Sequence, residues 1–298
     1  MESDLFSRQQ TDVLRGMAAI VIAVFHVLIQ WHCHRVVNLP GSVAVAMFLV
    51  LSGFGLNESY KRSGLKDYWR KRLRRVIFPY WLFLAVVTLL QGFPGWKTFL
   101  LDACFIKSDY WFVPFLVQWY LVYWIVQRWF SSGLVPILMV LGLIVLNFHS
   151  QVEAEQAFSF LAGILISQHI ETLRSKQRAY WLRAAIGCFL LATAFLLLKE
   201  IPAVHAQKGT AFYNHILFFI KLPMALSLLL LPMFFAPLCR SRILRLAGIA
   251  SLEIYLVHFP LFPHVEKTLL SFSLFIVAVT VLVFIFYQIN HRLIARWL

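Results

Sequence analysis

The chain has 298 residues, of which 61% are apolar and only 13% charged, and its formal net charge is +14. A soluble domain is roughly half apolar and about a quarter charged, so this composition excludes a protein with an ordinary water-facing surface. The mean hydropathy of +0.77 instead indicates a chain that lies mostly in lipid.

Many apolar segments are long enough to cross a hydrocarbon core of about 30 Å at 1.5 Å per residue. We therefore predict an all-α fold, a polytopic membrane bundle of about ten transmembrane helices that occupies residues 1–298 as a single domain. The first apolar segment lacks a small-residue cleavage site, so we expect it to be retained rather than removed as a signal peptide. The predicted spans are 13–31, 40–57, 76–91, 111–129, 133–148, 157–170, 181–198, 212–236, 247–263 and 269–290.

Basic residues are distributed unevenly over the loops that alternate between the two sides of the membrane. Loops on one side carry 20 Lys and Arg residues and loops on the other carry 6, with Lys221 left inside a span. By the positive-inside rule, both termini and residues 61–75 are predicted to be cytoplasmic. Because the positive charge is explained by topology, we expect no nucleic-acid partner. A second role of the basic residues is to attract an anionic ligand or anionic membrane lipid.

The cysteines leave one pairing open. Cys33 and Cys104 both fall on the predicted outer side, where a disulfide between them is permitted. The sequence His32, Cys33, His34 has metal-ligand side chains, but adjacent residues point apart on a helix and two loop residues need further ligands. We expect no metal site.

The first predicted span carries ionisable residues on one stripe. Arg15 and His26 are eleven positions apart, which is about 16 Å of rise and leaves them within about 20° of each other on an α-helix. Ionisable groups inside spans are costly and indicate function. One interpretation is a ligand that enters from the cytoplasm with its anionic end at Arg15. The other is a histidine bonded to a neighbouring carbonyl and a snorkelling arginine.

The second predicted span ends in FLVLSGFGL, and a strongly basic segment follows it. Ser52 can donate a hydrogen bond within the membrane. Arg72 and Arg75 are three positions apart and would face the same way on a helix, from which their forked donors can hold phosphate. We expect both arginines to be solvated. The alternative is an amphipathic helix that lies on anionic lipid.

Two later spans also hold polar or aromatic residues. In the ninth, Tyr255 and His258 share a face, whereas Glu253 points elsewhere and needs a partner, for which Lys221 is a candidate. The fourth span, YWFVPFLVQWYLVYW, is rich in aromatic residues. We interpret them as an interfacial aromatic belt rather than as a surface on which a sugar stacks.

Five segments in chain order then suggest a family: LRGMAAIVIAVFH, MFLVLSGFG, RLRRVIFPYW, the YWFV and WYLVY stretch, and SLEIYLVHFPL. Together they resemble the acyltransferase 3 family of integral membrane acyltransferases, which includes O-acetyltransferases of bacterial surface polysaccharides. The resemblance covers nearly the whole chain and implies a multi-pass protein of the bacterial inner membrane. Leu51 stands where many members have Phe, an apolar exchange that puts little in doubt.

The resemblance also implies an activity. Such an enzyme takes an acyl group, usually acetyl, from cytoplasmic acyl-coenzyme A and delivers it to a hydroxyl of a cell-envelope polysaccharide or lipid-linked sugar. The family's essential residues correspond to Arg15 and His26, and its donor-binding pair to Arg72 and Arg75. Ser52, Tyr255 and His258 are further candidates for positioning the substrate.

The residues and the resemblance agree on one mechanism. Arg15, Arg72 and Arg75 hold the coenzyme A phosphates, and His26 acts as general base on the acceptor hydroxyl or carries the acyl group itself. The competing prediction is a transporter or flippase of an amphiphilic or lipid-linked substrate. The sequence leaves the acceptor, the acyl group and the oligomeric state open.

Overall fold

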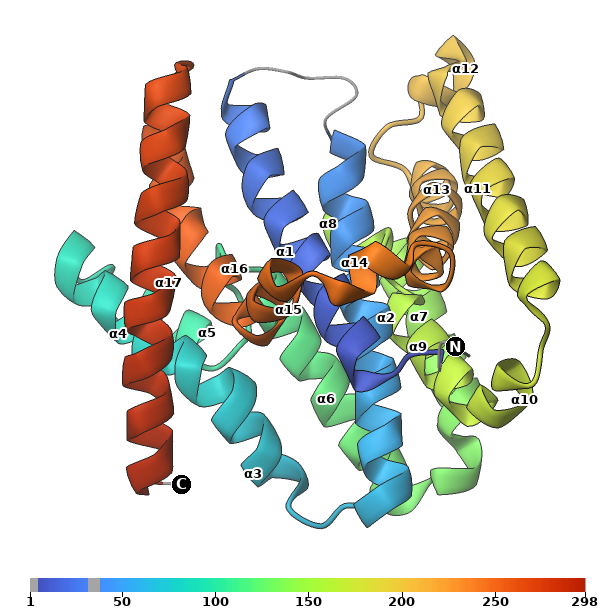
Figure 1. Cartoon of the computed structure of the whole chain (residues 1–298), viewed down its shortest axis with the longest axis horizontal. Coiled ribbons are helices and arrows are strands. Elements are labelled where there is room, and N and C mark those ends of the chain that lie inside the picture. The colour runs from blue at the N-terminus through green and yellow to red at the C-terminus, as the bar shows by residue number, and fades with distance from the viewer. Residues whose placement is uncertain (1–4, 32–37, 298) are drawn as a thin grey trace.

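The computed structural model describes residues 5–31 and 38–297, and every regular element within these two ranges is a helix (Figure 1). The predicted all-α class is therefore confirmed. The longer helices are α1 (Arg8–Gln30), α2 (Asn38–Ser63), α4 (Phe78–Gln91), α6 (Phe112–Trp129), α7 (Leu134–Phe148), α11 (Arg178–Glu200), α13 (Ala211–Leu229) and α17 (Leu269–Trp297). The shorter helices are α3 (Tyr68–Arg72), α5 (Trp96–Ala103), α8 (Gln151–Ala154), α9 (Ser159–Gln168), α10 (Ile170–Arg174), α12 (Pro202–His205), α14 (Ala236–Arg240), α15 (Arg242–Ile249) and α16 (Ser251–Leu261).

The number of spans is smaller than predicted. Seven helical segments in the described ranges are long and apolar enough to cross a membrane, or eight if the bent pair α15 and α16 counts as one span. Helices form at the predicted fourth and sixth spans, but neither joins this set. α6 carries glutamines, tyrosines and tryptophans that make it less apolar. α9 has 10 residues, which is only about 15 Å of helix.

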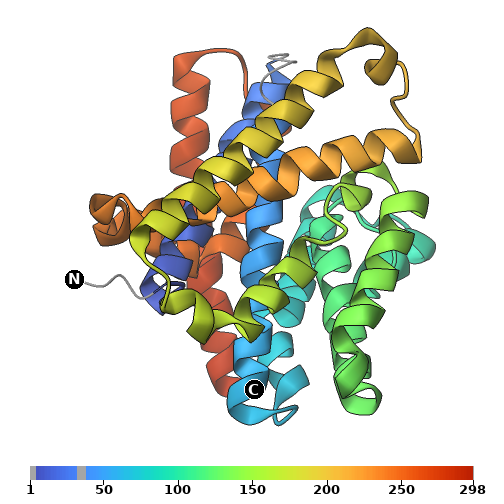
Figure 2. The same cartoon turned by 90° about the vertical axis from the view of Figure 1, so that its right-hand side faces the viewer.

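Two connections mark opposite ends of the bundle, whereas α14 and α15 cross its middle. Figure 1 shows the α2–α3 connection and the C-terminus at one end, and α12 and the beginning of α17 at the other. The α2–α3 connection and the C-terminus therefore share an end of the bundle. The side of the membrane on which this end lies stays a prediction. Figure 2 shows α11 and α13 running side by side across one face of the molecule.

α1 lies in the middle of the bundle and packs against α2, α15 and α16. Its contact with α15 depends on two glycines. A Cβ atom on Gly16 would lie 1.8 Å from the carbonyl oxygen of Leu244, and one on Gly248 would lie 1.7 Å from that of Asp12. The two backbones therefore touch, a packing that only residues without a side chain permit.

The predicted ninth span is broken. α15 and α16 are bent by 80° at a break of one residue, Ala250. Because of this bend, α15 contacts the beginning of α1 at Gly16, whereas α16 brings His258 to the other half of α1 at His26. The break thus places polar residues of one predicted span at two depths along α1.

The buried charges find different partners from the one considered in the sequence. Glu253 accepts a hydrogen bond from Asn290 of α17, with 3.3 Å between Oε1 and Nδ2. Lys221 instead interacts electrostatically with Glu155, and both are almost completely buried. Glu253 and Lys221 therefore have partners other than each other, and the suggested Lys221–Glu253 pair is replaced by contacts to Asn290 and Glu155.

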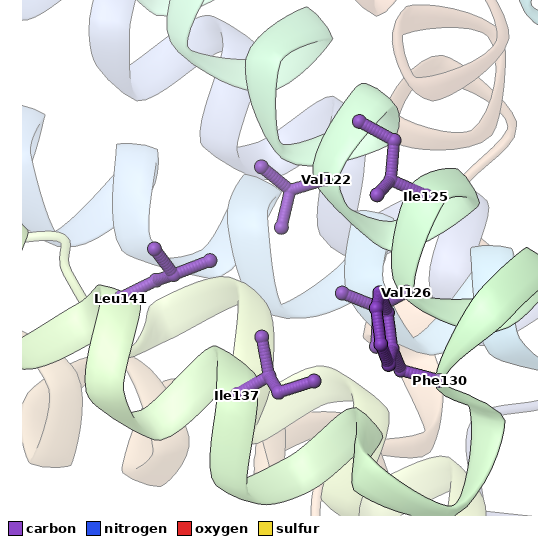
Figure 3. Close-up of a pocket in the computed structure, with 6 residues that line it drawn as sticks. All are labelled: Val122, Ile125, Val126, Phe130, Ile137 and Leu141. Carbon is purple, nitrogen blue, oxygen red and sulfur yellow. The ribbon is translucent and has the colours of Figure 1, made fainter.

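A shallow hollow lies on the surface between α6 and α7. It has a volume of about 240 Å³ and is lined by Val122, Ile125, Val126, Phe130, Ile137 and Leu141. Figure 3 shows that all six side chains are hydrocarbon. Such a surface suits lipid chains, and it offers no group for a phosphate or a hydroxyl.

Candidate functional site

α1 carries the two residues that the sequence singled out, and it runs without a break between them. Ser7 caps its beginning by accepting a hydrogen bond from the Gln10 amide. Arg15 and His26 therefore have the spacing expected for a continuous helix, about 16 Å along the axis and on the same side. The site has two ends, one at each of these residues.

At the first end, Arg15 bridges α1 and α2. Its Nη2 atom lies 3.4 Å from the carbonyl oxygen of Leu51, which directly precedes Ser52. Its Nη1 atom lies 3.9 Å from Asp12, one turn earlier on α1. The side chain keeps 32% of its surface exposed. Arg15 is thus anchored by the protein and still open to a ligand.

The phenol of Tyr120, on α6, lies at the centre of this end. Arg15, Arg72 and Arg75 all interact electrostatically with it, and the Ser52 side chain hydrogen-bonds to it. α1, α3 and the α3–α4 junction therefore each bring one cation to the same phenol. Clustered guanidinium groups of this kind provide the donors that bind phosphate or pyrophosphate.

Arg72 and Arg75 are not equivalent. Arg72 is buried, with 9% of its surface exposed, and its Nη1 atom donates to the Tyr68 carbonyl at 3.2 Å. Arg75 is exposed. A π-helical stretch, Leu73–Ile77, separates α3 from α4. The expectation that both arginines are solvated is wrong for Arg72, because aromatic rings of α3 and α6 enclose its guanidinium group.

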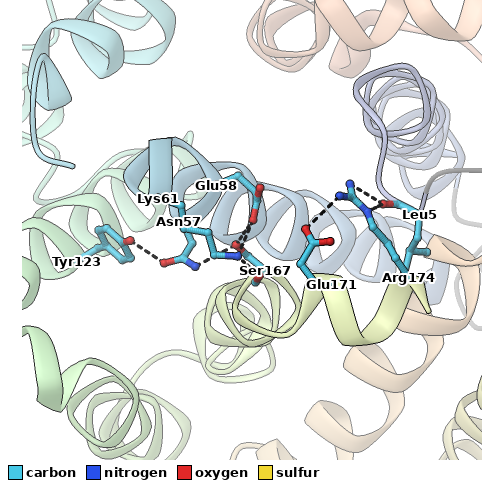
Figure 4. A network of polar contacts seen from close by, with 8 residues as sticks. All are labelled: Leu5, Asn57, Glu58, Lys61, Tyr123, Ser167, Glu171 and Arg174. Atoms are coloured by element: carbon cyan, nitrogen blue, oxygen red, sulfur yellow. Dashed lines mark hydrogen bonds and ion pairs between the residues drawn. The ribbon is translucent and has the colours of Figure 1, made fainter. Parts of the chain in front are cut away.

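A polar network fixes the helices behind these rings (Figure 4). Tyr123 of α6 donates to Asn57 of α2 at 2.8 Å, and Asn57 donates to Ser167 of α9 at 2.9 Å. Ser167 donates in turn to Glu58 at 2.7 Å. The ring of Tyr123 lies parallel to that of Tyr68, with centroids 6.3 Å apart. The network therefore supports the aromatic surface on which Arg72 rests.

At the second end, His26 of α1 meets His258 of α16. The Nδ1 atom of His26 lies 2.8 Å from the Nε2 atom of His258. The Nδ1 atom of His258 lies 2.8 Å from the Ile254 carbonyl oxygen, one turn earlier on α16. His258 is completely buried, and His26 is half-buried. The rings of Phe259 and Phe262 surround the pair.

Tyr255 lies one turn before His258 and is buried as well. Its ring centroid is 5.9 Å from that of His258 and 5.4 Å from that of Phe112. The phenol also hydrogen-bonds to the backbone at Phe112. Tyr255 therefore joins α16 to α6 and holds the helix that carries His258.

The predicted site residues thus form two groups. Arg15, Ser52, Arg72 and Arg75 gather around Tyr120, and His26, His258 and Tyr255 gather at the other end of α1. The sequence reasoning missed Tyr120 and Tyr68. It assigned the aromatic residues of the fourth span to an interfacial belt, whereas Trp119, Tyr120 and Tyr123 are buried inside the bundle. The cysteine and histidine residues at positions 32–34 lie outside the described residues, so the Cys33–Cys104 pairing stays a prediction.

Comparison with known proteins gives one match. The family model described as an acyltransferase domain matches residues 8–289, nearly the whole chain. No curated protein and no solved structure matches the chain.

Proposed function

The chain belongs to the acyltransferase 3 family, and we propose that it is a membrane O-acyltransferase that moves an acyl group, acetyl in the simplest case, from cytoplasmic acyl-coenzyme A to a hydroxyl of a cell-envelope carbohydrate. The family membership supports acyl transfer over the transporter considered from the sequence. The identities of the donor and the acceptor and the roles of the site residues are proposed.

One observation carries this proposal: a cationic cluster and a histidine pair lie at opposite ends of one side of α1. The arginines around Tyr120 suit the phosphates and pyrophosphate of coenzyme A. His26 lies about 16 Å further along α1, a distance that an extended pantetheine arm can span. The donor would then enter by its thioester and keep its charged end at the basic end of the bundle.

At the second end, His26 supplies the ring nitrogen that takes a proton. The acceptor oxygen forms a bond with the acyl carbonyl carbon while its proton passes to His26. The carbon–sulfur bond then breaks, and the sulfur takes this proton and leaves as the free thiol. In the covalent alternative, His26 attacks the thioester carbon, and the carbon–sulfur bond breaks and releases the thiolate. The acceptor hydroxyl then attacks the acyl-histidine carbon, the carbon–nitrogen bond breaks, and the hydroxyl proton passes to the thiolate.

The direct test uses purified protein in nanodiscs with acetyl-coenzyme A labelled in the acetyl group and an envelope carbohydrate extract. Acyl transfer releases free thiol and places label on carbohydrate, whereas a transporter leaves the thioester intact. Rapid quenching distinguishes the two roles of His26, because only the covalent route places label on the protein.

The control is His26→Ala, which should abolish transfer but still bind coenzyme A, because the phosphate end lies about 16 Å away. Thiol release that persists in this variant at a tenth of the parent rate or more would assign the chemistry to another residue. No release above the variant with several donors and extracts would contradict the proposed donor and acceptor.

A further inference from the structure

The two hydrogen bonds of His258 determine which of its nitrogens carries hydrogen. A carbonyl oxygen only accepts, so the Nδ1 atom of His258, 2.8 Å from the Ile254 oxygen, must carry a hydrogen. His258 has no exposed surface, and a second hydrogen on its Nε2 atom would place an unpaired charge there. Its Nε2 atom therefore has a lone pair and accepts.

The orientation of the rings supports this bond. The two ring planes differ by 15°, and their centroids are 5.0 Å apart. With 2.8 Å between the nitrogens, this separation places the rings edge to edge and the bond close to both ring planes, where the lone pair of an imidazole points. His26 must then donate from its Nδ1 atom.

From this chain of bonds, we propose that His258 is a positioning residue that fixes the tautomer of His26 and leaves the Nε2 atom of His26 as the reactive nitrogen. This inference rests on the proposed function of His26. It assigns His258 a task different from the one suggested by the sequence, which was to position the acceptor.

The assignment also describes how the proton moves. When the Nε2 atom of His26 takes the acceptor proton, the ring becomes an imidazolium that still donates from Nδ1 to the lone pair of His258. The bond therefore persists through the step and strengthens as His26 becomes charged. When the thiol leaves, it takes the proton from the Nε2 atom of His26, and both histidines return to their starting state.

Two amide substitutions separate the two bonds of His258. In His258→Gln, the longer side chain places its carbonyl oxygen where the Nε2 atom of His258 lies, so the acceptor for His26 is kept. In His258→Asn, the shorter side chain reaches the Ile254 oxygen but not His26. Asn147 of this chain already donates to the carbonyl four residues before it in the same way, at 2.8 Å. The variants are matched in polarity and charge.

We expect His258→Asn to lower kcat about 10- to 100-fold, the same range as the loss of a hydrogen bond that orients a metal-ligating histidine. The KM values of donor and acceptor should stay within about twofold of the parent. His258→Gln should retain a kcat within about fivefold of the parent. Equal losses in both variants, or a loss expressed in the acceptor KM, would overturn the proposal and return His258 to acceptor binding or packing.

A second measurement does not depend on turnover. In protein labelled with 15N-histidine, the signals absent from His26→Ala identify the His26 ring. The parent and His258→Gln should show a protonated Nδ1 and a bare Nε2 atom for His26, and His258→Asn should show a mixture of tautomers. A bare Nδ1 atom in the parent would refute the tautomer assignment, even if acyl transfer itself is demonstrated. If no acyl transfer is found but this pattern is seen, the proposed function fails and the tautomer assignment stands.

Discussion

The guanidinium carbon of Arg72 lies 4.3 Å above the ring centroid of Tyr68, its neighbour one turn earlier in α3. The Tyr68 hydroxyl donates to the Tyr120 carbonyl at 2.7 Å. One tyrosine therefore supports the Arg72 cation with its ring and anchors α3 to α6 with its hydroxyl. The two tasks can be separated by substitution.

Tyr68→Leu should weaken binding of acyl-coenzyme A, whereas Tyr68→Phe should preserve most of it. The leucine removes a cation–π contact worth about 1 to 2 kcal/mol in a desolvated setting, roughly a five- to thirtyfold change in Kd if Arg72 binds the donor. The phenylalanine keeps this contact and loses one hydrogen bond, about 1 kcal/mol of stability. Calorimetric titration of coenzyme A checks the affinities. Equal affinity in all three proteins would show that Arg72 does not contact the donor.

Arg75→Ala and Arg72→Ala should differ in stability. Arg75 is exposed, and such a substitution changes the free energy of unfolding by less than about 0.5 kcal/mol. Arg72 is buried against two rings, so its loss leaves a cavity and removes the side-chain hydrogen bond to the Tyr68 carbonyl, at a cost of about 1 to 3 kcal/mol. Thermal unfolding in detergent distinguishes them, and each variant should also bind coenzyme A more weakly. A stable Arg72→Ala protein would contradict the enclosed position of this arginine.

The sequence predicts the relative position of two site residues well when both lie on one helix, and poorly when they lie on different helices. The positions of Arg15 and His26 follow from the spacing alone, because α1 is unbroken. The burial of Arg72 did not follow, because the ring of Tyr120 that covers it belongs to α6, 48 residues later in the chain. Hydropathy also read α9 as a span, since it detects apolar residues and not the 10-residue length of the helix.

The histidine pair shows the same limit. His258 was recognised as polar and on the same face as Tyr255, yet its partner lies 232 residues away. The pairing depends on the 80° bend between α15 and α16, which a hydropathy profile does not reveal because both sides of the bend are apolar. The Ser251–Leu261 helix would otherwise continue along the direction of α15.

Replacing one member of the buried pair Lys221 and Glu155 should lower the stability of the protein more than replacing both. Glu155→Gln leaves the Lys221 cation without its compensating charge, at a cost of about 3 to 5 kcal/mol. Replacing both, as Glu155→Gln with Lys221→Met, should recover most of this stability. Thermal unfolding of the two single variants and the double variant forms the test. Additive losses in the double variant would show that the residues do not interact.

The topology predicts which loop residues are accessible from outside the cell. Lys66, between α2 and α3, and His205, the last residue of α12, are both exposed. Figure 1 shows the α2–α3 connection and α12 at opposite ends of the bundle. In a variant without the four native cysteines, an impermeant thiol reagent applied to intact cells should label Cys placed at position 205 and not at position 66. After the membrane is permeabilised, both should react. The reverse pattern in intact cells would show that the protein has the opposite orientation in the membrane, with the arginine cluster outside.

The contact between α1 and α15 gives the sharpest stability prediction, because it requires glycine on both helices. In Gly248→Ala the new Cβ atom would lie 1.7 Å from the Asp12 carbonyl oxygen, and backbone cannot rotate away as a side chain can. α15 must therefore move, which should cost about 1 to 3 kcal/mol as overpacking does. The movement would also shift α16 and with it His258, so activity should fall even in protein that remains folded.

Gly187→Ala is the matched control for this substitution. Gly187 lies within α11, and a Cβ atom there would meet nothing within 4 Å. Alanine favours a helix over glycine by about 1 kcal/mol, so this variant should be as stable as the parent or more stable, and fully active. Unfolding temperatures and kcat of the two alanine variants are compared in the same nanodiscs. If Gly248→Ala matches Gly187→Ala in both measurements, the backbones of α1 and α15 do not touch as described, and the position of α16 does not depend on that contact.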